Sequence, residues 1–128
     1  MNGMYINCRA WPFIAWILSG WKLYETRTRN TLRALVGQRV ALIETGTGHT
    51  PTVRGYATIT SAERVEYNDT EARKAARILE TSYDIRPNGA KIFYRLTDVT
   101  PCKPYPVPAD RMNHGRAWTT YTTTETEG

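Results

Sequence analysis

The stretch that determines most of the expected fold is residues 6–27, which reads INCRAWPFIAWILSGWKLYETR. Pro12 suits the first position of a helix, residues 13–18 supply a broad apolar surface, and Gly20 is placed to end that helix in a left-handed cap. Residues 21–27 then alternate as an extended segment. The stretch therefore predicts a short, mostly buried helix followed directly by a strand.

Three charged side chains of both signs, Lys22, Glu25 and Arg27, stand in this otherwise hydrophobic stretch. Buried charges are costly unless they are paired or used, so we expect them to form a cluster. Glu25 and Arg27 fall on the same face of a strand and can pair, whereas Thr26 points to the opposite face. Lys22, at the strand's entry, is placed to complete the cluster over a cleft.

The rest of the chain predicts short strands interrupted by two helical segments. Gly55 lies inside one strand and predicts a bulge or a close backbone approach. A helix is expected from Asp69 or Thr70 to about Ser82, with Arg73, Lys74, Arg77 and Glu80 facing water. The other expected elements are strands at residues 5–6, 40–44, 53–60 and 91–99, a helical turn at 31–35 and a loop at 46–51.

The last third of the chain differs in composition. We interpret its prolines as breaking regular structure and forming an extended surface connector; they are Pro101, Pro104, Pro106 and Pro108. Because strands outnumber helices and the central strands follow one another through turns, we predict an α+β fold, a small β-barrel with two to three flanking helices. Residues 1–121 would form this single domain, and residues 122–128 a frayed polar tail.

The net charge of +5 is confined to the first half of the chain. Residues 1–60 hold seven basic and two acidic side chains (7 − 2 = +5), and residues 61–128 hold ten of each sign. Four units of the excess lie between Lys22 and Arg39. This concentration indicates an anionic partner, most often nucleic acid, although charge alone is equally compatible with a solvated basic face.

Several classes of protein and site are not indicated. The longest apolar run, Trp11–Leu18, is shorter than the roughly 20 residues that span a bilayer, so we expect a cytoplasmic protein without a membrane partner. Cys8 and Cys102 lack the spacing of a zinc site, and we expect both to be buried structural thiols. The chain has no P-loop, GxGxxG, GxSxG or HExxH motif, so we expect no metal and no cofactor. Nothing in the sequence indicates an oligomeric state.

The pattern around the first helix resembles the signature of the ASCH domain family, a branch of the PUA-like β-barrels. Arg9 and Trp11 precede the helix, and Gly-x-Lys-x-x-Glu-x-Arg follows it. Residues 36–43 and 53–59 are similar to the next two family elements. The resemblance thus covers residues 5–65 and, by the order of elements, extends to residue 99.

The resemblance implies a barrel with a cleft beside the first helix that binds a nucleotide or single-stranded RNA. It places Lys22, Glu25 and Arg27 in the cleft, with Arg9 beside them. Lysine and arginine suit phosphate oxygens, and a carboxylate accepts hydrogen bonds from a base or a sugar hydroxyl. We also expect ligand contacts from Arg29 and Arg116. Three aromatic residues are candidates for base stacking, although each is also suited to core packing: Trp21, Tyr24 and Trp118.

Catalysis at the same cleft is the alternative to binding alone. Metal-independent RNA cleavage needs a base near the 2′-hydroxyl, for which the candidates are Lys22, Glu25 and His114. Arg27 or Arg29 would supply the cation, and Arg116 would share the side of His114 in an extended segment. The alternative for His114 is a surface histidine in a polar loop, and for the charged cluster an internal salt-bridge network.

Some family members are amidohydrolases of acetylated cytidine that use a lysine, a threonine three residues on and a distant glutamate. Here Glu25 occupies the threonine position, which weakens that assignment because the nucleophile is missing. The leading prediction is therefore a nucleic-acid-binding domain, with RNA favoured over DNA, and RNA cleavage is the second prediction.

Overall fold

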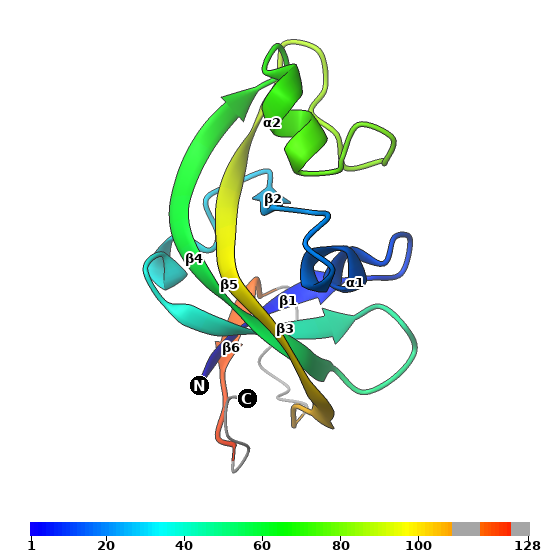
Figure 1. Ribbon diagram of the computed structural model, residues 1–128, viewed down its shortest axis with the longest axis vertical. Helices are drawn as coiled ribbons and strands as arrows, with labels where there is room; N and C mark the ends of the chain where they lie inside the picture. Colours follow the sequence, from blue (N-terminus) through cyan, green and yellow to red (C-terminus); the bar gives the residue numbers. More distant parts are fainter. Residues whose placement is uncertain (109–115, 124–128) are drawn as a thin grey trace.

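The computed structural model describes residues 1–108 and 116–123, and in this part of the chain a single sheet coils around the core (Figure 1). Its six strands lie in the order β2-β5-β4-β3-β1-β6. The elements are β1 (Asn2–Asn7), α1 (Phe13–Leu18), β2 (Tyr24–Arg27), the 3-10 turn η1 (Arg33–Leu35), β3 (Arg39–Thr45), β4 (Thr52–Glu66), α2 (Thr70–Ala75), β5 (Ala90–Pro106) and β6 (Trp118–Thr120). The α+β prediction of a small, single-domain barrel-like sheet with flanking helices is confirmed.

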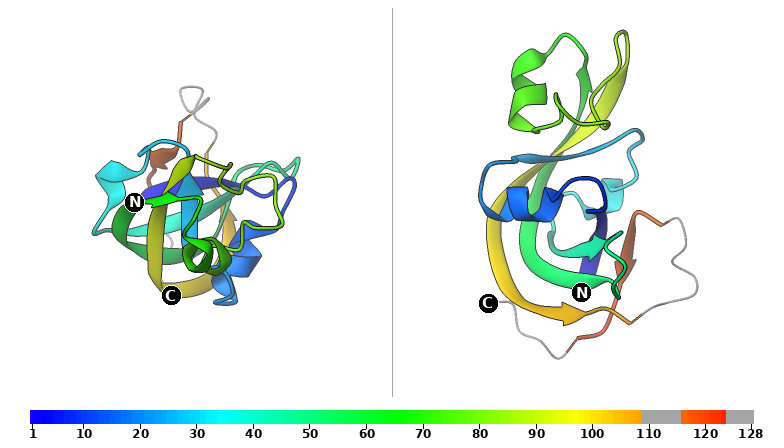
Figure 2. Two further views of the ribbon diagram at one scale, coloured as in Figure 1. Left: turned by 90° about the horizontal axis from the view of Figure 1, so that it is seen from above. Right: turned by 90° about the vertical axis from the view of Figure 1, so that its right-hand side faces the viewer.

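The strand pairing combines one parallel and four antiparallel contacts. β1 runs parallel to β3, and β3 and β4 form an antiparallel hairpin around the loop predicted at residues 46–51. The two longest strands, β4 and β5, pair along most of their length and project beyond the barrel to carry α2 at their tip (Figure 1). Seen from above, the strands enclose a central space that side chains fill (Figure 2, left).

Gly55 behaves as the sequence predicts. The register of β4 shifts next to it against both neighbouring strands. A Cβ atom at this position would lie 2.5 Å from the carbonyl oxygen of Thr100 and 2.7 Å from Cδ2 of Leu18. A glycine is therefore required where β4 bends closely over β5 and α1.

The expectation that the prolines leave regular structure is wrong for three of the four, because β5 continues through Pro101 and Pro104 and ends at Pro106. Pro108 does lie outside the strands. β2 pairs with β5 only at residues 92–95, so the later part of β5 lies at an edge of the sheet on that side. A residue without an N–H group is tolerated at such an edge, since its missing donor need not serve a neighbouring strand.

The helix predicted to reach Ser82 is wrong in its length, because α2 ends at Ala75. Its beginning is confirmed, since the Asp69 carboxylate caps it by accepting a hydrogen bond from the amide of Ala72 (3.1 Å). Arg77 then takes a left-handed conformation with φ of 57°. The carbonyl oxygens of Ala75 and Ala76, which a longer helix would use, instead accept hydrogen bonds from the segment after α1.

The orientation predicted for Arg73 is also wrong. Its side chain does not face water but is buried, because its guanidinium forms two parallel hydrogen bonds with the Asp84 carboxylate (3.0 and 2.7 Å). It also donates to the carbonyl oxygen of Tyr67 (2.9 Å). This pair fastens α2 to the loop that leads into β5, and the Arg73 guanidinium lowers the pKa of Asp84.

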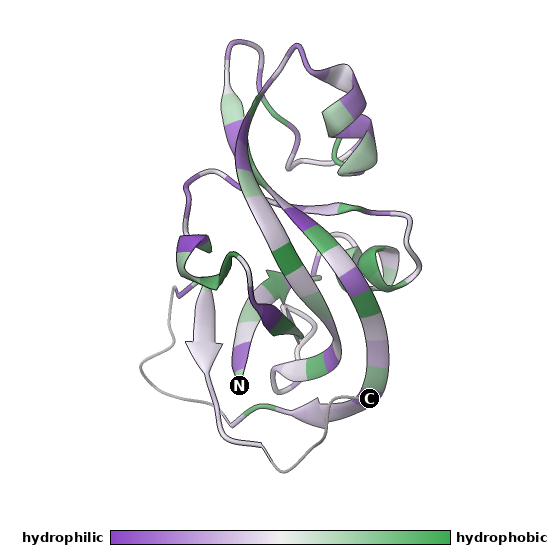
Figure 3. Ribbon diagram, turned by 60° about the vertical axis from the view of Figure 1, so that its left-hand side comes forward, coloured by the Kyte–Doolittle hydropathy of each residue, from purple (hydrophilic) through white to green (hydrophobic). Residues whose placement is uncertain are grey.

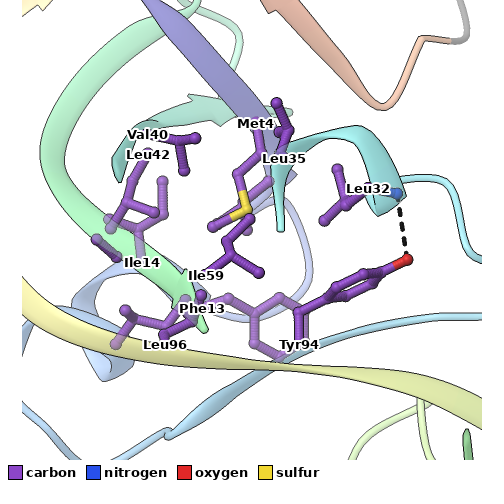
Figure 4. Close-up of a cluster of buried hydrophobic side chains, with 13 residues drawn as sticks. Met4, Phe13, Ile14, Leu32, Leu35, Val40, Leu42, Ile59, Tyr94 and Leu96 are labelled. Carbon is purple, nitrogen blue, oxygen red and sulfur yellow. Dashed lines mark hydrogen bonds between the residues drawn. The ribbon is translucent and has the colours of Figure 1, made fainter. Parts of the chain in front are cut away.

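The main core lies inside the coiled sheet, where α1 inserts its apolar face (Figure 4). Within it the Tyr94 hydroxyl accepts a hydrogen bond from the amide of Leu32 (3.1 Å) and donates one to Oδ1 of Asn30 (2.7 Å). Hydropathy alternates along the two long strands, as the alternating coloured bands show (Figure 3). The period-2 pattern of the sequence thus sets which side of each strand faces the core.

A second cluster, outside the main core, holds a chain of three tyrosine hydroxyl groups. The hydroxyls of Tyr56 and Tyr105 are 2.8 Å apart, and those of Tyr105 and Tyr121 are 2.7 Å apart. This chain ties the segment after β6 to β4 and β5. Nearby Cys102 is only half-buried, as is Cys8, so the expectation that both cysteines are buried is only partly met.

Candidate nucleic-acid interface

Lys22 follows α1 and turns its side chain inward. Its backbone amide and that of Trp21 both donate to the carbonyl oxygen of Trp16 (3.0 Å each). These two bonds fix the backbone of Trp21 and Lys22 at the end of the helix. Lys22 is 2% exposed, whereas Trp21 is 48% exposed. Gly20, with φ of 81°, forms the turn after the helix. Of the two residues that follow it, Trp21 is exposed and Lys22 is buried.

The Lys22 ammonium lies between α1 and the tip of the molecule. Nζ donates to the carbonyl oxygen of Ala76 (2.5 Å) and lies 4.9 Å from the centre of the Phe13 ring. Burial lowers the pKa of Lys22 to about 8; Glu25 opposes this shift and Lys91 adds to it. The lysine thus closes the end of α2, and its pKa of about 8 lies well below that of an exposed lysine.

Glu25 and Arg27 lie on β2 with the side chain of Glu25 directed inward. Glu25 stands opposite Tyr94 of β5 and is 6% exposed. Oε2 of Glu25 is 3.3 Å from Nη2 of Arg27, so the predicted pair is confirmed. Oε1 accepts a hydrogen bond from the amide of Thr26 (2.9 Å). One oxygen of the carboxylate therefore accepts a backbone hydrogen bond, and the other pairs with the Arg27 guanidinium.

The side chain of Arg27 extends from β2, at one edge of the sheet, to β1, near the other edge. Its Nη2 donates to the carbonyl oxygen of Tyr5 in β1 (2.5 Å), while the amide of Tyr5 donates to the carbonyl oxygen of Ala117 (3.0 Å). The Arg27 side chain is 22% exposed and so remains accessible from solvent. Arg116 precedes Ala117 and is exposed, so its backbone lies beside the residue that Arg27 contacts.

The other predicted site residues are spread over the surface. Arg9 is exposed in the loop between β1 and α1, and its Cβ lies beside Gly46 of the β3–β4 loop. Arg29 is exposed immediately after β2. His114 lies outside the described residues. The structure therefore brings together Lys22, Glu25 and Arg27 but leaves Arg9 and Arg29 at the surface.

One partly buried partner of the site, Lys91, has no signal in the local sequence. Lys91, at the start of β5, has a lowered pKa because of burial, with Glu25 and Asp84 opposing the shift. It is electrostatically coupled to Lys22 although 69 positions separate the two (91 − 22). Only the pairing of β5 with β2 brings it near, so no motif search on the sequence would have found it.

The predicted stacking residues have different environments. Tyr24 packs against Phe93, with ring centres 5.6 Å apart, and Arg95 lies over its ring at 5.5 Å. Trp118 is half-buried against the main core. Trp21 alone among the three predicted residues is largely exposed. A surface hollow lies at the tip of β4 and β5, lined by Arg64, Glu66, Tyr67, Asn68, Asn88 and Gly89.

No family model and no curated protein matches the sequence. Solved structures do match. One is ASCH from Zymomonas mobilis, with a TM-score of 0.66 and 21% identity over 96% of this chain and 87% of that chain. A serine-to-alanine variant of that protein matches with a TM-score of 0.70 and 20% identity, covering 96% of this chain and 88% of that chain.

A tyrosine-to-phenylalanine variant of the same Zymomonas mobilis protein matches with a TM-score of 0.65 and 21% identity, covering 96% of this chain and 90% of that chain. The chain therefore has the PUA-like fold of an ASCH domain, and the resemblance seen in the sequence is confirmed for the fold. Within residues 1–108 and 116–123, neither helix has the length and apolarity needed to cross a bilayer.

Proposed function

We propose that this ASCH-fold protein binds RNA or a nucleotide at the cluster formed by Lys22, Glu25 and Arg27. The supporting observation is that Lys22 and Glu25 are both buried, at 2% and 6% exposure, although each is ionisable. Such groups are costly to bury and occur preferentially at functional sites. The partly exposed Arg27 guanidinium provides the point where a ligand in solvent first meets the cluster.

The chemistry of the three side chains suits a nucleotide. Arg27 offers a planar set of donors for phosphate oxygens, and the Glu25 carboxylate accepts hydrogen bonds from amino and hydroxyl groups. Beyond the cluster, Arg29 and Arg33 are exposed on the segment that carries most of the net charge. They would add sequence-independent contacts to a phosphate backbone.

The test is salt-dependent binding of a labelled single-stranded RNA, followed by fluorescence anisotropy between about 50 and 200 mM salt. We expect Arg29→Ala combined with Arg33→Ala to weaken binding and to reduce the slope of log affinity against log salt by about 2. Glu25→Gln should weaken binding without reducing that slope. Lys103→Ala, which removes an exposed cation of β5, is the matched control. Absence of binding by the wild-type protein at low salt would refute the proposal.

A second candidate is RNA cleavage at the same cluster. The specific observation is the pKa of Lys22, lowered to about 8 by burial, which suits a general base near neutral pH. Incubation with single-stranded RNA should then give products whose rate of formation rises with pH up to about 8. Lys22→Met should abolish the cleavage while the Lys103→Met variant retains it. Intact RNA with the wild-type protein would leave binding as the function.

Acetylated cytidine should be included in the same assay as a separate substrate. The presence of Glu25 at the position of the family's threonine predicts that this nucleoside stays intact. Its deacetylation, lost in Glu25→Gln, would instead support the amidohydrolase alternative.

A further inference from the structure

Five aromatic rings form a connected set across α1, the segments directly before and after it, and the loop before β5. The ring centres of Phe13 and Trp16 are 5.6 Å apart, and those of Phe13 and Tyr83 are 5.3 Å apart. Trp16 also lies 6.1 Å from Trp11 and 4.9 Å from Trp21. We call this set, consisting of Trp11, Phe13, Trp16, Trp21 and Tyr83, the aromatic surface.

The two ends of the aromatic surface are open to solvent. Phe13 is buried, whereas Trp21 is 48% and Tyr83 is 38% exposed. Among the described residues, the other exposed large hydrophobics are Val36, Tyr67 and Leu79. Tyr67 and Leu79 belong to the same projecting tip as Tyr83, and α1 and α2 lie on one side of the long β4–β5 ribbon (Figures 1 and 2). Exposed rings that are linked in this way through the rings between them indicate a binding surface.

Cations accompany three of the five rings. The Arg77 guanidinium lies 4.4 Å from the ring centre of Trp21, and its Nε donates to the Trp21 carbonyl oxygen (2.7 Å). Nζ of Lys91 lies 5.7 Å from the ring centre of Tyr83 and donates to its carbonyl oxygen. Lys22 occupies the corresponding place at Phe13, 4.9 Å from the ring centre.

The combination of exposed rings and adjacent cations matches the chemistry of a single strand of nucleic acid. Unpaired bases stack on aromatic side chains whatever their sequence, and the phosphates between them attract lysine and arginine. Two of these cations, Arg77 and Lys91, stand at exposed rings, and an apolar protein partner would gain little from them. Bases inside a duplex are already stacked on one another and are not available to side chains.

We propose that the aromatic surface binds single-stranded nucleic acid by stacking bases on Trp21 and Tyr83, with Arg77 and Lys91 next to the intervening phosphates. This inference rests on the proposed function and narrows its ligand to an oligonucleotide with unpaired bases. Phe13 contacts both Tyr83 and Lys22, so the aromatic surface adjoins the buried cluster. A strand lying on the surface therefore passes the site at which a nucleotide would be held.

The experiment measures the affinity of the full chain for single-stranded oligoadenylate of about 12 nucleotides, for a duplex of the same length and for adenosine monophosphate. We expect Trp21→Ala and Tyr83→Ala each to weaken binding of the single strand about 5- to 150-fold, because one stacked base is worth roughly 1–3 kcal/mol. Trp21→Phe and Tyr83→Phe, which keep an aromatic face, should stay near the wild-type affinity. Lys103→Ala is the control for nonspecific charge.

Binding of the single strand should also quench the fluorescence of Trp21, and Trp21→Phe should remove that part of the signal. Thermal unfolding of each variant establishes that it is folded. If a Trp21→Ala variant does not fold, Trp21→Leu and Tyr83→Leu replace the alanine variants, since leucine retains apolar volume without a stacking face.

Two results would overturn this inference while leaving the proposed function standing: unchanged affinity for the single strand in the Trp21→Leu and Tyr83→Leu double variant, or equal affinity of the wild-type protein for single strand and duplex. A third such result is that the Trp21→Leu and Tyr83→Leu double variant loses binding of adenosine monophosphate together with binding of the single strand. The inference requires the aromatic surface to adjoin the nucleotide site without forming part of it. If the wild-type protein binds neither nucleotide nor oligonucleotide at low salt, the proposed function and this inference both fail.

Discussion

Nη2 of Arg27 donates a 2.5 Å hydrogen bond to the backbone carbonyl oxygen of Tyr5. Arg27 belongs to β2, which is the first strand in the order of the sheet, and Tyr5 belongs to β1, the fifth. Within the described part of the chain no ladder of backbone hydrogen bonds joins these two strands, so this side-chain bond closes the coiled sheet. The same guanidinium holds Glu25 at 3.3 Å, so one side chain serves both the fold and the candidate site.

Replacement of Arg27 by methionine should destabilise the protein. The change leaves the Glu25 carboxylate buried without its cation and the Tyr5 carbonyl without this donor. Because Arg27 is partly exposed, we expect a loss of about 1–3 kcal/mol in the free energy of unfolding, measured by chemical denaturation. Arg29→Met, at an exposed position, should change it by less than about 0.5 kcal/mol. Equal stability of the two variants would contradict the role of Arg27 in closing the sheet.

The buried Lys22 should make stability depend on pH. Its pKa is lowered from 10.5 to about 8 in the folded chain, so between these two values the unfolded state binds more protons. Stability from this group therefore rises as pH increases from about 8 to 10.5, and the full penalty of the charged form applies below about pH 8.

The measurement is the difference in the free energy of unfolding between Lys22→Met and wild type at several pH values. This difference should fall by about 2 kcal/mol from pH 7 to pH 10, because only the wild-type protein loses the penalty. Comparing the two proteins cancels the other groups that titrate in the same range. The exposed Lys103→Met variant should show a constant difference from wild type, and a constant difference for Lys22→Met would refute the lowered pKa.

The close approach at Gly55 predicts a large effect of one added methyl group. A Cβ there meets the Thr100 carbonyl oxygen, which is backbone and cannot rotate away. Gly55→Ala should therefore lower the free energy of unfolding by roughly 1–3 kcal/mol, as measured by denaturant titration. Thr60→Ala, at an exposed position of the same strand, provides the comparison. A Gly55→Ala protein as stable as wild type would show that β4 does not pack so closely.

The hydroxyl of Tyr105 is the centre of the chain that links Tyr56 to Tyr121. Tyr105→Phe removes both of its hydrogen bonds inside a largely buried cluster, and we expect the free energy of unfolding to fall by about 1–3 kcal/mol. Tyr5→Phe, which alters a half-buried tyrosine outside that chain, should have a smaller effect. The prediction fails if thermal unfolding of Tyr105→Phe coincides with that of wild type.

Residues 6–27 by themselves determine the short helix, the turn at Gly20 and the strand that follows, because apolar periodicity, glycine and alternation act locally. They also predict that Glu25 and Arg27 share a face, since side chains alternate along any strand. The position of Gly55 predicts its bulge for the same local reason. The ASCH resemblance carried by these residues identified the fold correctly.

The tertiary structure alone decides the features that depend on residues far apart in sequence. The end of α2 is one, because Leu23 and Lys22 occupy the carbonyl groups of Ala75 and Ala76 and stop the helix that the sequence pattern would continue. The continuation of β5 through Pro106 is another such feature. β2 pairs with β5 only at residues 92–95, and this pairing decides that the later part of β5 lies at an edge where prolines are tolerated.

The sequence shows that the charge excess lies in the first half of the chain, but it does not show how these charged side chains are arranged in space. Burial separates Lys22 and Glu25 from the exposed Arg29, and strand pairing adds Lys91 from the second half of the chain. The ring of Tyr83 likewise meets Phe13 only because the tip folds toward α1. Local propensity acts between near neighbours, whereas burial and electrostatic coupling are set by the complete fold. The sequence therefore indicated which charged residues to consider for the candidate site, but not how they are arranged.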